Sequence, residues 1–259
     1  MEDEDYKSLV SEHYKKQAEE HNFALTSTMP DQNIRKKEIE NILKYLNDGE
    51  KCLEIGCGNG AASTMISKIR SLNLLSIDST KEMIELANQQ SQKEVKGELS
   101  FKHQSILDLD EKQEFDSVFT IRCIINLMNW EDQKLALENM SKRVKNNGKL
   151  ILLEAFSDGL EELNQARKEM GLESISPAYH NLYLKKEKVI EFLSKNNFEL
   201  LEENNFLSTY YFGTRVIYPA LAKANKVDMV FNSKIDSFFS HFPPYGNFAH
   251  IKILVFKKK

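Results

Sequence analysis

Short apolar runs alternate along this chain with segments whose apolar residues recur every three or four positions. The runs lie at residues 51–55, 73–77, 99–103, 115–121 and 149–155, and each has the length of a buried strand. The segments between them, such as residues 61–69, have the periodicity of helices. Strands and helices that alternate in this way predict an α/β fold with a mostly parallel sheet and right-handed crossovers.

The pattern is less regular on both sides of these alternating elements. Before them, residues 6–22 have the pattern of a polar helix, and residues 31–46 that of an amphipathic helix that Asp31 caps. After them, we expect helices at 160–170 and 187–196, an extended stretch at 198–218 and a mostly helical insertion at 219–240. Residues 248–257 alternate like a strand. Because no crossover helix comes directly before this strand, we expect it to be antiparallel.

Composition narrows the classes of protein that fit this pattern. The net charge of −4 and the scattered lysines favour no nucleic-acid partner. The three cysteines have neither Cys-x-x-Cys nor zinc spacing, and free thiols fit a reducing compartment. The chain starts with acidic residues instead of the basic start of a signal peptide, and no apolar run approaches the length of a membrane span. We therefore expect a cytoplasmic protein that does not bind membranes.

The stretch from Cys52 to Gly60 is the most informative part of the sequence. An apolar run is followed at once by a turn with glycines at positions 56, 58 and 60. Gly56, Gly58 and Gly60 allow a left-handed turn and a close approach of the backbone to a ligand. A strand, a glycine-rich turn and a helix form a nucleotide-binding crevice. The spacing also fits the NAD fingerprint, whereas Glu54, two residues before the first glycine, is suited to face a cation.

A second acid lies where the next apolar run ends. Asp78 follows the glycines by about 20 residues, the spacing at which a carboxylate accepts hydrogen bonds from both ribose hydroxyls. The alternative is a structural role at the start of the helical pattern in residues 82–87, where Asp78, Ser79 or Thr80 caps the helix. The two roles are compatible, with Asp78 on the ribose and Ser79 or Thr80 as the cap.

Together these motifs resemble class I S-adenosylmethionine-dependent methyltransferases. The matching segments are Leu53–Gly60, Ser76–Asp78, Gln104–Leu109, Phe115–Thr120 and Val144–Leu152. The resemblance covers roughly residues 30 to 155 and is looser at both ends, where such families select their acceptor. It implies an enzyme with a three-layer Rossmann-like fold, in which a mostly parallel seven-stranded sheet has an antiparallel last strand. It also implies S-adenosylmethionine as cofactor and a small molecule as substrate.

The resemblance also suggests where the cofactor binds. The glycine turn would lie along the methionine part and Asp78 on the ribose, while adenine would lie against Gln104–Ile106, where Ser105 stands in place of the acid that many members have. Arg35 would pair with the cofactor's carboxylate, and Tyr14 would either close over the site or pack on the core. The residues expected to bind the cofactor are Tyr14, Arg35, Glu54, Gly56, Gly58, Gly60, Asp78, Ser79, Ser105, Ile106 and Thr120.

Candidates for acceptor binding follow the fourth strand and lie in three aromatic segments near the end of the chain. Arg122 would bind a carboxylate or phosphate, or else form an ion pair with an acid such as Glu154. His180 and His241 are candidates for a general base, although isolated histidines are more often surface or packing residues. The residues expected to bind the acceptor are Arg122, Asn126, Tyr179, Tyr183, Tyr210, Tyr211 and Arg215. The His, Asp and Glu residues are too scattered to predict a metal site.

The sequence therefore predicts one domain over residues 1–259. It would consist of an N-terminal helical cap (1–48), a cofactor-binding core (49–157) and acceptor-side elements with the final strands (158–259). The expected reaction moves a methyl group to a small polar acceptor, at an oxygen of a sugar-, phosphate- or carboxylate-bearing metabolite. A regulatory protein that binds the cofactor without turnover and an NAD-dependent oxidoreductase are the alternatives. The sequence does not indicate an oligomeric state.

Overall fold

The computed structural model describes residues 3–21, 30–90, 94–110 and 112–259, so residues 22–29 of the expected N-terminal cap lie outside it. The described residues form a seven-stranded sheet in the order β3-β2-β1-β4-β5-β7-β6. The strands are β1 (Lys51–Ile55), β2 (Asn73–Asp78), β3 (Glu98–His103), β4 (Phe115–Ile121), β5 (Val144–Ala155), β6 (Phe198–Asn204) and β7 (Ile251–Lys258). Strands β1 to β5 are parallel, and β7 is antiparallel to both β5 and β6. The α/β fold with an antiparallel last strand is confirmed.

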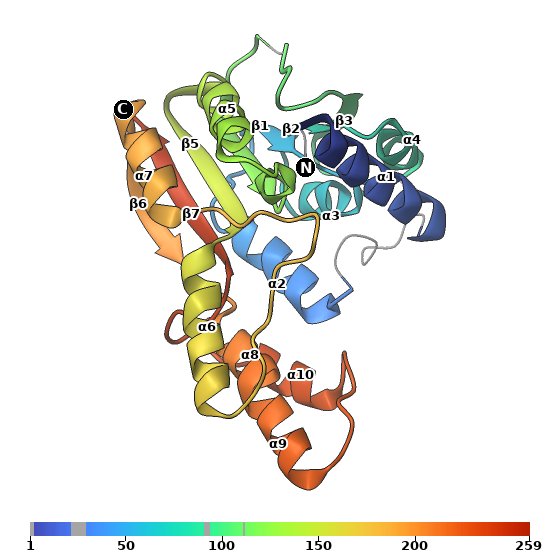
Figure 1. Cartoon of the computed structure of the whole chain (residues 1–259). Coiled ribbons are helices and arrows are strands. Elements are labelled where there is room, and N and C mark those ends of the chain that lie inside the picture. Colours follow the sequence, from blue (N-terminus) through green and yellow to red (C-terminus); the bar gives the residue numbers. More distant parts are fainter. Residues whose placement is uncertain (1–2, 22–29, 91–93, 111) are drawn as a thin grey trace.

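Helices cover both faces of the sheet and make three layers (Figure 1). The helices are α1 (Asp3–His21), α2 (Gln32–Ile42), α3 (Ala61–Ile69), α4 (Lys81–Gln89), α5 (Trp130–Ser141), α6 (Ser157–Glu169), α7 (Lys186–Lys195), α8 (Ser208–Phe212), α9 (Tyr218–Asn225) and α10 (Lys234–Ser240). Successive side chains of β5 point to opposite faces. Leu150 and Leu152 therefore join a core cluster with α5 and α7, whereas Ile151 and Leu153 join a cluster with α2 and α3. No described helix has both the length and the apolar character that crossing a membrane requires.

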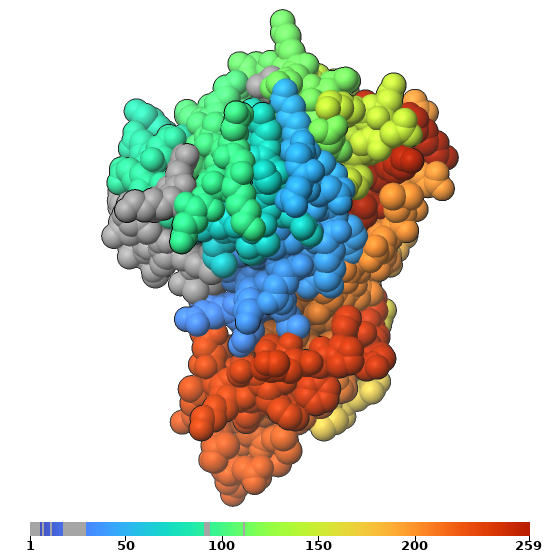
Figure 2. All heavy atoms as spheres, turned by 180° about the vertical axis from the view of Figure 1, so that it is seen from behind, coloured from blue at the N-terminus to red at the C-terminus, as the bar shows by residue number. Residues whose placement is uncertain are grey.

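The carboxyl ends of the parallel strands β1 to β5 define the edge of the sheet that carries the site, here called the carboxyl edge. Because β5 and β6 are both antiparallel to β7, β6 runs parallel to β5 and ends at this same edge. Helices α6, α8, α9 and α10 extend from it as a separate lobe, here called the lower lobe (Figure 1). The opposite view shows the orange and red residues of this lobe projecting beyond the core (Figure 2). Ligands of open α/β sheets bind at the carboxyl edge.

One predicted element is wrong. The sequence favoured an extended stretch over residues 198–218, but β6 ends at Asn204, and residues 208–217 form α8 and a π-helical turn, Gly213–Ile217. Aromatic and β-branched residues dominate this segment and favour strands locally. The helix forms nevertheless because it buries Leu207, Tyr210, Tyr211 and Val216, at helical spacing, against the core.

Candidate cofactor and acceptor site

The turn after β1 has the left-handed backbone that its glycines allow. The φ angles of Gly56, Gly58 and Gly60 are 78°, 54° and 74°. The turn is fixed to the neighbouring strand because the N–H of Gly56 donates to the carbonyl oxygen of Ile77 over 2.8 Å. A β-carbon at position 56 would lie 2.4 Å from the sulfur of Cys123, so only glycine fits there without a shift of its neighbours. The glycine at this position is required by both backbone conformation and packing.

Asp78 ends β2 and turns back toward the glycine turn. Its Oδ2 accepts a hydrogen bond from the N–H of Gly58, and its Oδ1 accepts one from the N–H of Thr80, both over 2.8 Å. Burial raises the pKa of this carboxyl group, while these hydrogen bonds oppose the rise. The side chain of Thr80 also hydrogen-bonds to this carboxylate, which lies in the wall of a cavity. Thr80, and not Asp78, is the N-cap of α4.

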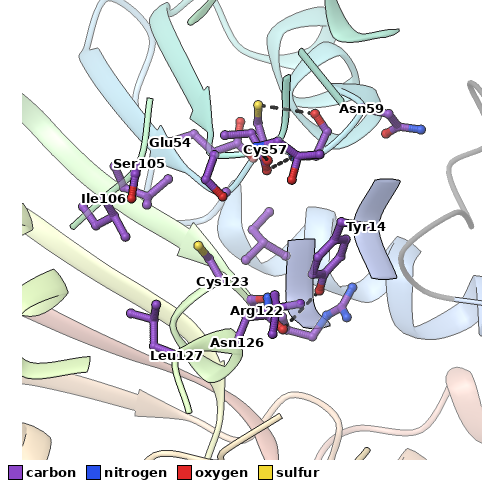
Figure 3. A pocket seen from close by; sticks show the side chains of 18 of the residues that line it. Tyr14, Glu54, Cys57, Asn59, Ser105, Ile106, Arg122, Cys123, Asn126 and Leu127 are labelled. Atoms are coloured by element: carbon purple, nitrogen blue, oxygen red, sulfur yellow. Dashed lines mark hydrogen bonds between the residues drawn. The ribbon is translucent and has the colours of Figure 1, made fainter. Parts of the chain in front are cut away.

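A cavity of about 300 Å³ lies between the glycine turn, Asp78 and helix α1 (Figure 3). This volume is at the lower end of the range for small-molecule sites. Nine of the expected cofactor residues line it: Tyr14, Arg35, Glu54, Gly56, Gly58, Asp78, Ser79, Ser105 and Ile106. Gly60 is outside the lining, as the N-cap of α3, and Thr120 is buried in β4.

Further lining residues were not among the expected ones. Tyr6 and Val10 line the cavity beside Tyr14. The signal for them was present, because positions 6, 10 and 14 share one face of a helix. Cys57 and Cys123 also line the cavity, and burial raises the pKa of both thiols well above its usual range. A raised pKa keeps both thiols protonated at neutral pH, and the thiol is less nucleophilic than the thiolate.

Glu54 is a buried acid in the wall of the cavity. Its Oε2 accepts hydrogen bonds from the hydroxyls of Ser63 and Ser76, over 2.5 and 2.8 Å. Burial raises its pKa, and the two hydroxyls and the positive charge of Arg35 oppose that rise. The cavity therefore has a polar, acidic wall beside the glycine turn.

Two arginines at the cavity share one buried carboxylate. Oε1 of Glu38 lies 2.7 Å from Nε of Arg122, and its Oε2 lies 3.1 Å from Nη1 of Arg35. The acid that pairs with Arg122 is thus Glu38 and not Glu154, whose Oε1 accepts the N–H of Cys123 over 2.9 Å. Burial lowers the pKa of Arg35 to about 10. Both guanidinium groups are held in place by Glu38, and part of their charge is neutralised.

Helix α1 contributes Tyr6, Val10 and Tyr14 to the wall of the cavity. The hydroxyl of Tyr14 donates to Oδ1 of Asn126 over 3.1 Å, and both side chains face the cavity (Figure 3). Burial raises the pKa of Tyr14 to about 12, so its hydroxyl is a hydrogen-bond donor at neutral pH. Tyr14 thus lies in the cavity wall, and its role in closing over the cofactor stays a prediction.

The expected acceptor residues are divided between several places. Arg122 and Asn126 line the cavity, whereas the four tyrosines, Arg215 and both candidate histidines do not. Arg215 lies in the π-helical turn and not at a strand end, and its Nη2 is 3.0 Å from Oδ2 of Asp31. The hydroxyl of Tyr210 donates to the same carboxylate over 2.9 Å.

The two candidate histidines also lie apart. His180 stacks on His13 of α1, with ring centroids 4.0 Å apart, and His241 is exposed at the end of α10, where its Nδ1 lies 2.7 Å from the carbonyl oxygen of Ser237. A third histidine, His250, is surrounded by aromatic residues at the carboxyl edge. Its ring stacks on Tyr183 with centroids 4.9 Å apart. His250 was not among the residues that the sequence predicted for the site. The sequence signal that could have indicated it is its position directly before the last strand.

Fold and site together define a Rossmann-like protein with a nucleotide-binding crevice. Comparison with known sequences identifies the family within this class of proteins. The family described as methyltransferase domain matches residues 46–206. The chain belongs to this methyltransferase family, for which S-adenosylmethionine is the methyl donor.

Individual relatives are more distant. An O-methyltransferase, rstn1, of Aspergillus nomiae is 25% identical over 112 residues, which are 42% of this chain and 48% of the relative. The chain spans less than half the length of the curated relatives that it matches. Among solved structures, magnesium protoporphyrin IX methyltransferase of Synechocystis PCC 6803 with bound S-adenosylhomocysteine has a TM-score of 0.57 at 16% identity, covering 96% of this chain and 94% of that one.

The fold by itself does not identify the reaction. The cyclase SpnF has a TM-score of 0.59 at 14% identity, covering 88% of this chain and 82% of that chain. Proteins described as a methyltransferase and as a cyclase therefore share this architecture. The activity of the present protein has to be argued from its site.

Proposed function

We propose that this protein is an S-adenosylmethionine-dependent methyltransferase that methylates an oxygen of a small polar metabolite bearing a sugar, phosphate or carboxylate group. S-adenosylmethionine supplies a methyl group on a positively charged sulfur. The protein has to hold donor and acceptor in line and exclude water. The cavity at the glycine turn, which is lined by the acids Glu54 and Asp78, has the chemistry to hold such a donor.

The observation that carries the proposal is the position of Asp78. Its carboxylate lies at the end of β2, lines the cavity and is tied to the glycine turn through the N–H of Gly58. A ribose placed against the glycine turn would lie beside this carboxylate, which accepts hydrogen bonds from hydroxyl groups. Glu54 adds a buried acid beside the turn, which favours a cationic sulfur over a second phosphate.

The acceptor would lie at the carboxyl edge between the cavity and the lower lobe. Arg122 and Asn126 line the cavity. Arg215 and Tyr211 lie in the lower lobe, with the guanidinium carbon 5.6 Å from the centre of the tyrosine ring. Arginine recognises carboxylate and phosphate well. Because Glu38 and Asp31 already pair with these two arginines, an anionic acceptor would have to compete with them or share them.

Binding and turnover are tested separately. Calorimetric titration with S-adenosylhomocysteine should show one site, and Asp78→Asn should weaken it by about 2–4 kcal/mol, because the amide loses the charge-assisted hydrogen bonds to the ribose. Asp110→Asn, at an exposed acid paired with Lys102, is the control and should bind like the wild type. Equal affinity of wild type and Asp78→Asn would remove Asp78 from the site.

Turnover separates an enzyme from a regulatory protein that only binds the cofactor. Donor with a labelled methyl group, incubated with sugars, phosphorylated compounds, carboxylates and amines, should label an oxygen acceptor. Saturable binding of S-adenosylhomocysteine without any labelled product from this panel would favour the regulatory role.

A further inference from the structure

His250 is held by an aromatic cluster that the cofactor site does not account for. Its ring stacks on Tyr183 with an interplanar angle of 18°, and the ring of Tyr211 meets it edge-on, with centroids 4.7 Å apart. The hydroxyl of Tyr211 lies 3.3 Å from Nε2. The imidazole therefore has a fixed orientation, with one nitrogen bonded to a tyrosine.

The main chain around His250 is anchored to the end of β5. The carbonyl oxygen of His250 accepts the N–H of Phe156 over 2.7 Å. On the other side of Phe156, an isolated parallel bridge joins it to Leu184, the residue after Tyr183. Both rings of the stack are thus attached to the carboxyl edge of the sheet, the usual ligand edge of this architecture.

The second ring nitrogen, Nδ1, has no hydrogen-bond partner in the part of the chain that the structure describes. Nδ1 of His250 has no contact with solvent and no hydrogen bond among the residues that the structure describes. Native proteins pair almost all buried polar atoms, and an unpaired one calls for an explanation, such as a missing ligand. A group able to donate a hydrogen bond, such as a hydroxyl, would satisfy a bare Nδ1.

The charges around the cluster keep this imidazole neutral. Burial and the nearby Arg215 and Arg122 lower the pKa of His250 to about 3. The hydroxyls of Tyr211 and Tyr183 are also neutral at physiological pH, because burial raises the pKa of both. Arg122 lines the cofactor cavity, and its charge acts on His250 and Tyr183, so the cluster lies within electrostatic range of the cavity wall.

We propose that His250 binds the acceptor's hydroxyl group through Nδ1 and accepts its proton during methyl transfer. This inference rests on the proposed function. As the acceptor oxygen forms its bond to the methyl carbon, the carbon–sulfur bond breaks and its electron pair stays on sulfur, while the hydroxyl proton moves to Nδ1. Nε2–H then donates to the oxygen of Tyr211, which orients the ring.

The acceptor has to reach a nitrogen that is shielded from solvent in this structure. The main chain on both sides of Tyr183 is fixed, because the N–H of Leu182 donates to the carbonyl oxygen of Ile125 over 2.7 Å and the N–H of Leu184 donates to that of Ala155 over 2.9 Å. The side chain of Tyr183 itself is only partly buried. Rotation of this side chain would expose the imidazole to the acceptor and then cover it again.

The first test needs no substrate. In ¹⁵N-histidine-labelled wild-type protein, NMR coupling patterns report which ring nitrogen carries hydrogen, and His250→Asn assigns the signals. We expect His250 to be neutral at pH 7 with hydrogen on Nε2 and none on Nδ1. Hydrogen on Nδ1 would overturn the proposal, because that nitrogen could not then take a proton from the acceptor.

The second test uses two variants at the same position. His250→Asn keeps a hydrogen-bonding atom near Nδ1, and His250→Phe keeps the stacked ring; neither can take up the proton. Both should bind S-adenosylhomocysteine within about twofold of wild type and lose about 10²-fold in kcat/KM, the lower end of the usual contribution of a general base, because the low pKa of His250 makes it a weak base.

Acceptor acidity separates this role from a structural one. The loss of kcat/KM in the two variants should be largest for sugars, whose hydroxyls are weakly acidic. It should shrink along a series of phenols of increasing acidity, because a more acidic acceptor ionises without a base. A loss that is the same across the series, or wild-type rates in both variants, would refute the role of His250. If the wild type itself neither binds S-adenosylhomocysteine nor transfers methyl, the proposed function fails instead.

Discussion

Substitution of Gly56 by alanine tests whether packing against the β4 end, and not only backbone conformation, fixes the glycine turn. Gly56 and Gly49 have similar φ angles, 78° and 84°. A β-carbon at Gly56 would lie 2.4 Å from the sulfur and 2.5 Å from the β-carbon of Cys123, whereas a β-carbon at Gly49 meets no atom within 4 Å. Gly49→Ala is therefore a matched control with the same backbone strain and no clash.

The magnitude follows from two separate costs. A left-handed conformation costs an L-residue about 1–2 kcal/mol, and both variants bear this cost. The overlap with Cys123 adds about 1–3 kcal/mol, as usual for overpacking, in Gly56→Ala alone. The lower entropy of the unfolded chain favours alanine over glycine equally in both variants and cancels in the comparison. Gly56→Ala should thus be less stable than Gly49→Ala by about 1–3 kcal/mol.

Urea unfolding followed by circular dichroism measures this difference, and calorimetry with S-adenosylhomocysteine should show impaired binding for Gly56→Ala alone. Combining it with Cys123→Gly removes both clashing atoms and leaves the nearest one, the α-carbon of residue 123, at 3.6 Å. The double-mutant cycle should therefore recover about 1–3 kcal/mol. Equal stability of Gly56→Ala and Gly49→Ala, or no coupling in the cycle, would refute the packing argument.

Two further predictions concern buried charge. Glu38→Gln removes the carboxylate that Arg35 and Arg122 share, and it should lower the free energy of unfolding by about 3–5 kcal/mol. The control is Glu40→Gln at an exposed position on the same helix, which should change the free energy of unfolding by less than about 0.5 kcal/mol. Similar urea midpoints for the two variants would contradict this prediction. Because the pKa of His250 falls from 6.5 to about 3 on folding, the unfolded state binds a proton that the folded state does not. The free energy of unfolding should therefore decrease as the pH falls from 6.5 toward 3. His250→Phe should reduce the slope of the free energy of unfolding against pH by up to about 1.4 kcal/mol per pH unit. Identical slopes for wild type and variant would show that His250 is not buried as a neutral group.

The sequence by itself determined the elements whose signals are local. The apolar run before Gly56 and the left-handed turn that its glycines allow lie within ten residues, and this is the range over which periodicity and turn chemistry act. The position of Asp78 beside the glycine turn was predictable for a similar reason, because the next strand of a parallel unit ends beside the first. The antiparallel β7 also followed from a local observation, the absence of a helix directly before it.

Only the tertiary structure decided which side chains meet across the carboxyl edge. Glu38 and Arg122 are 84 positions apart, and no local pattern indicates that they form a pair. Tyr183 and His250 meet only because both adjoin segments that bind Phe156 at the end of β5. Residues 208–217 adopt helical turns against their local preference, since burying their aromatic face against the core outweighs it. Long-range packing sets these choices, and so the acceptor side of the site is where the sequence was least informative.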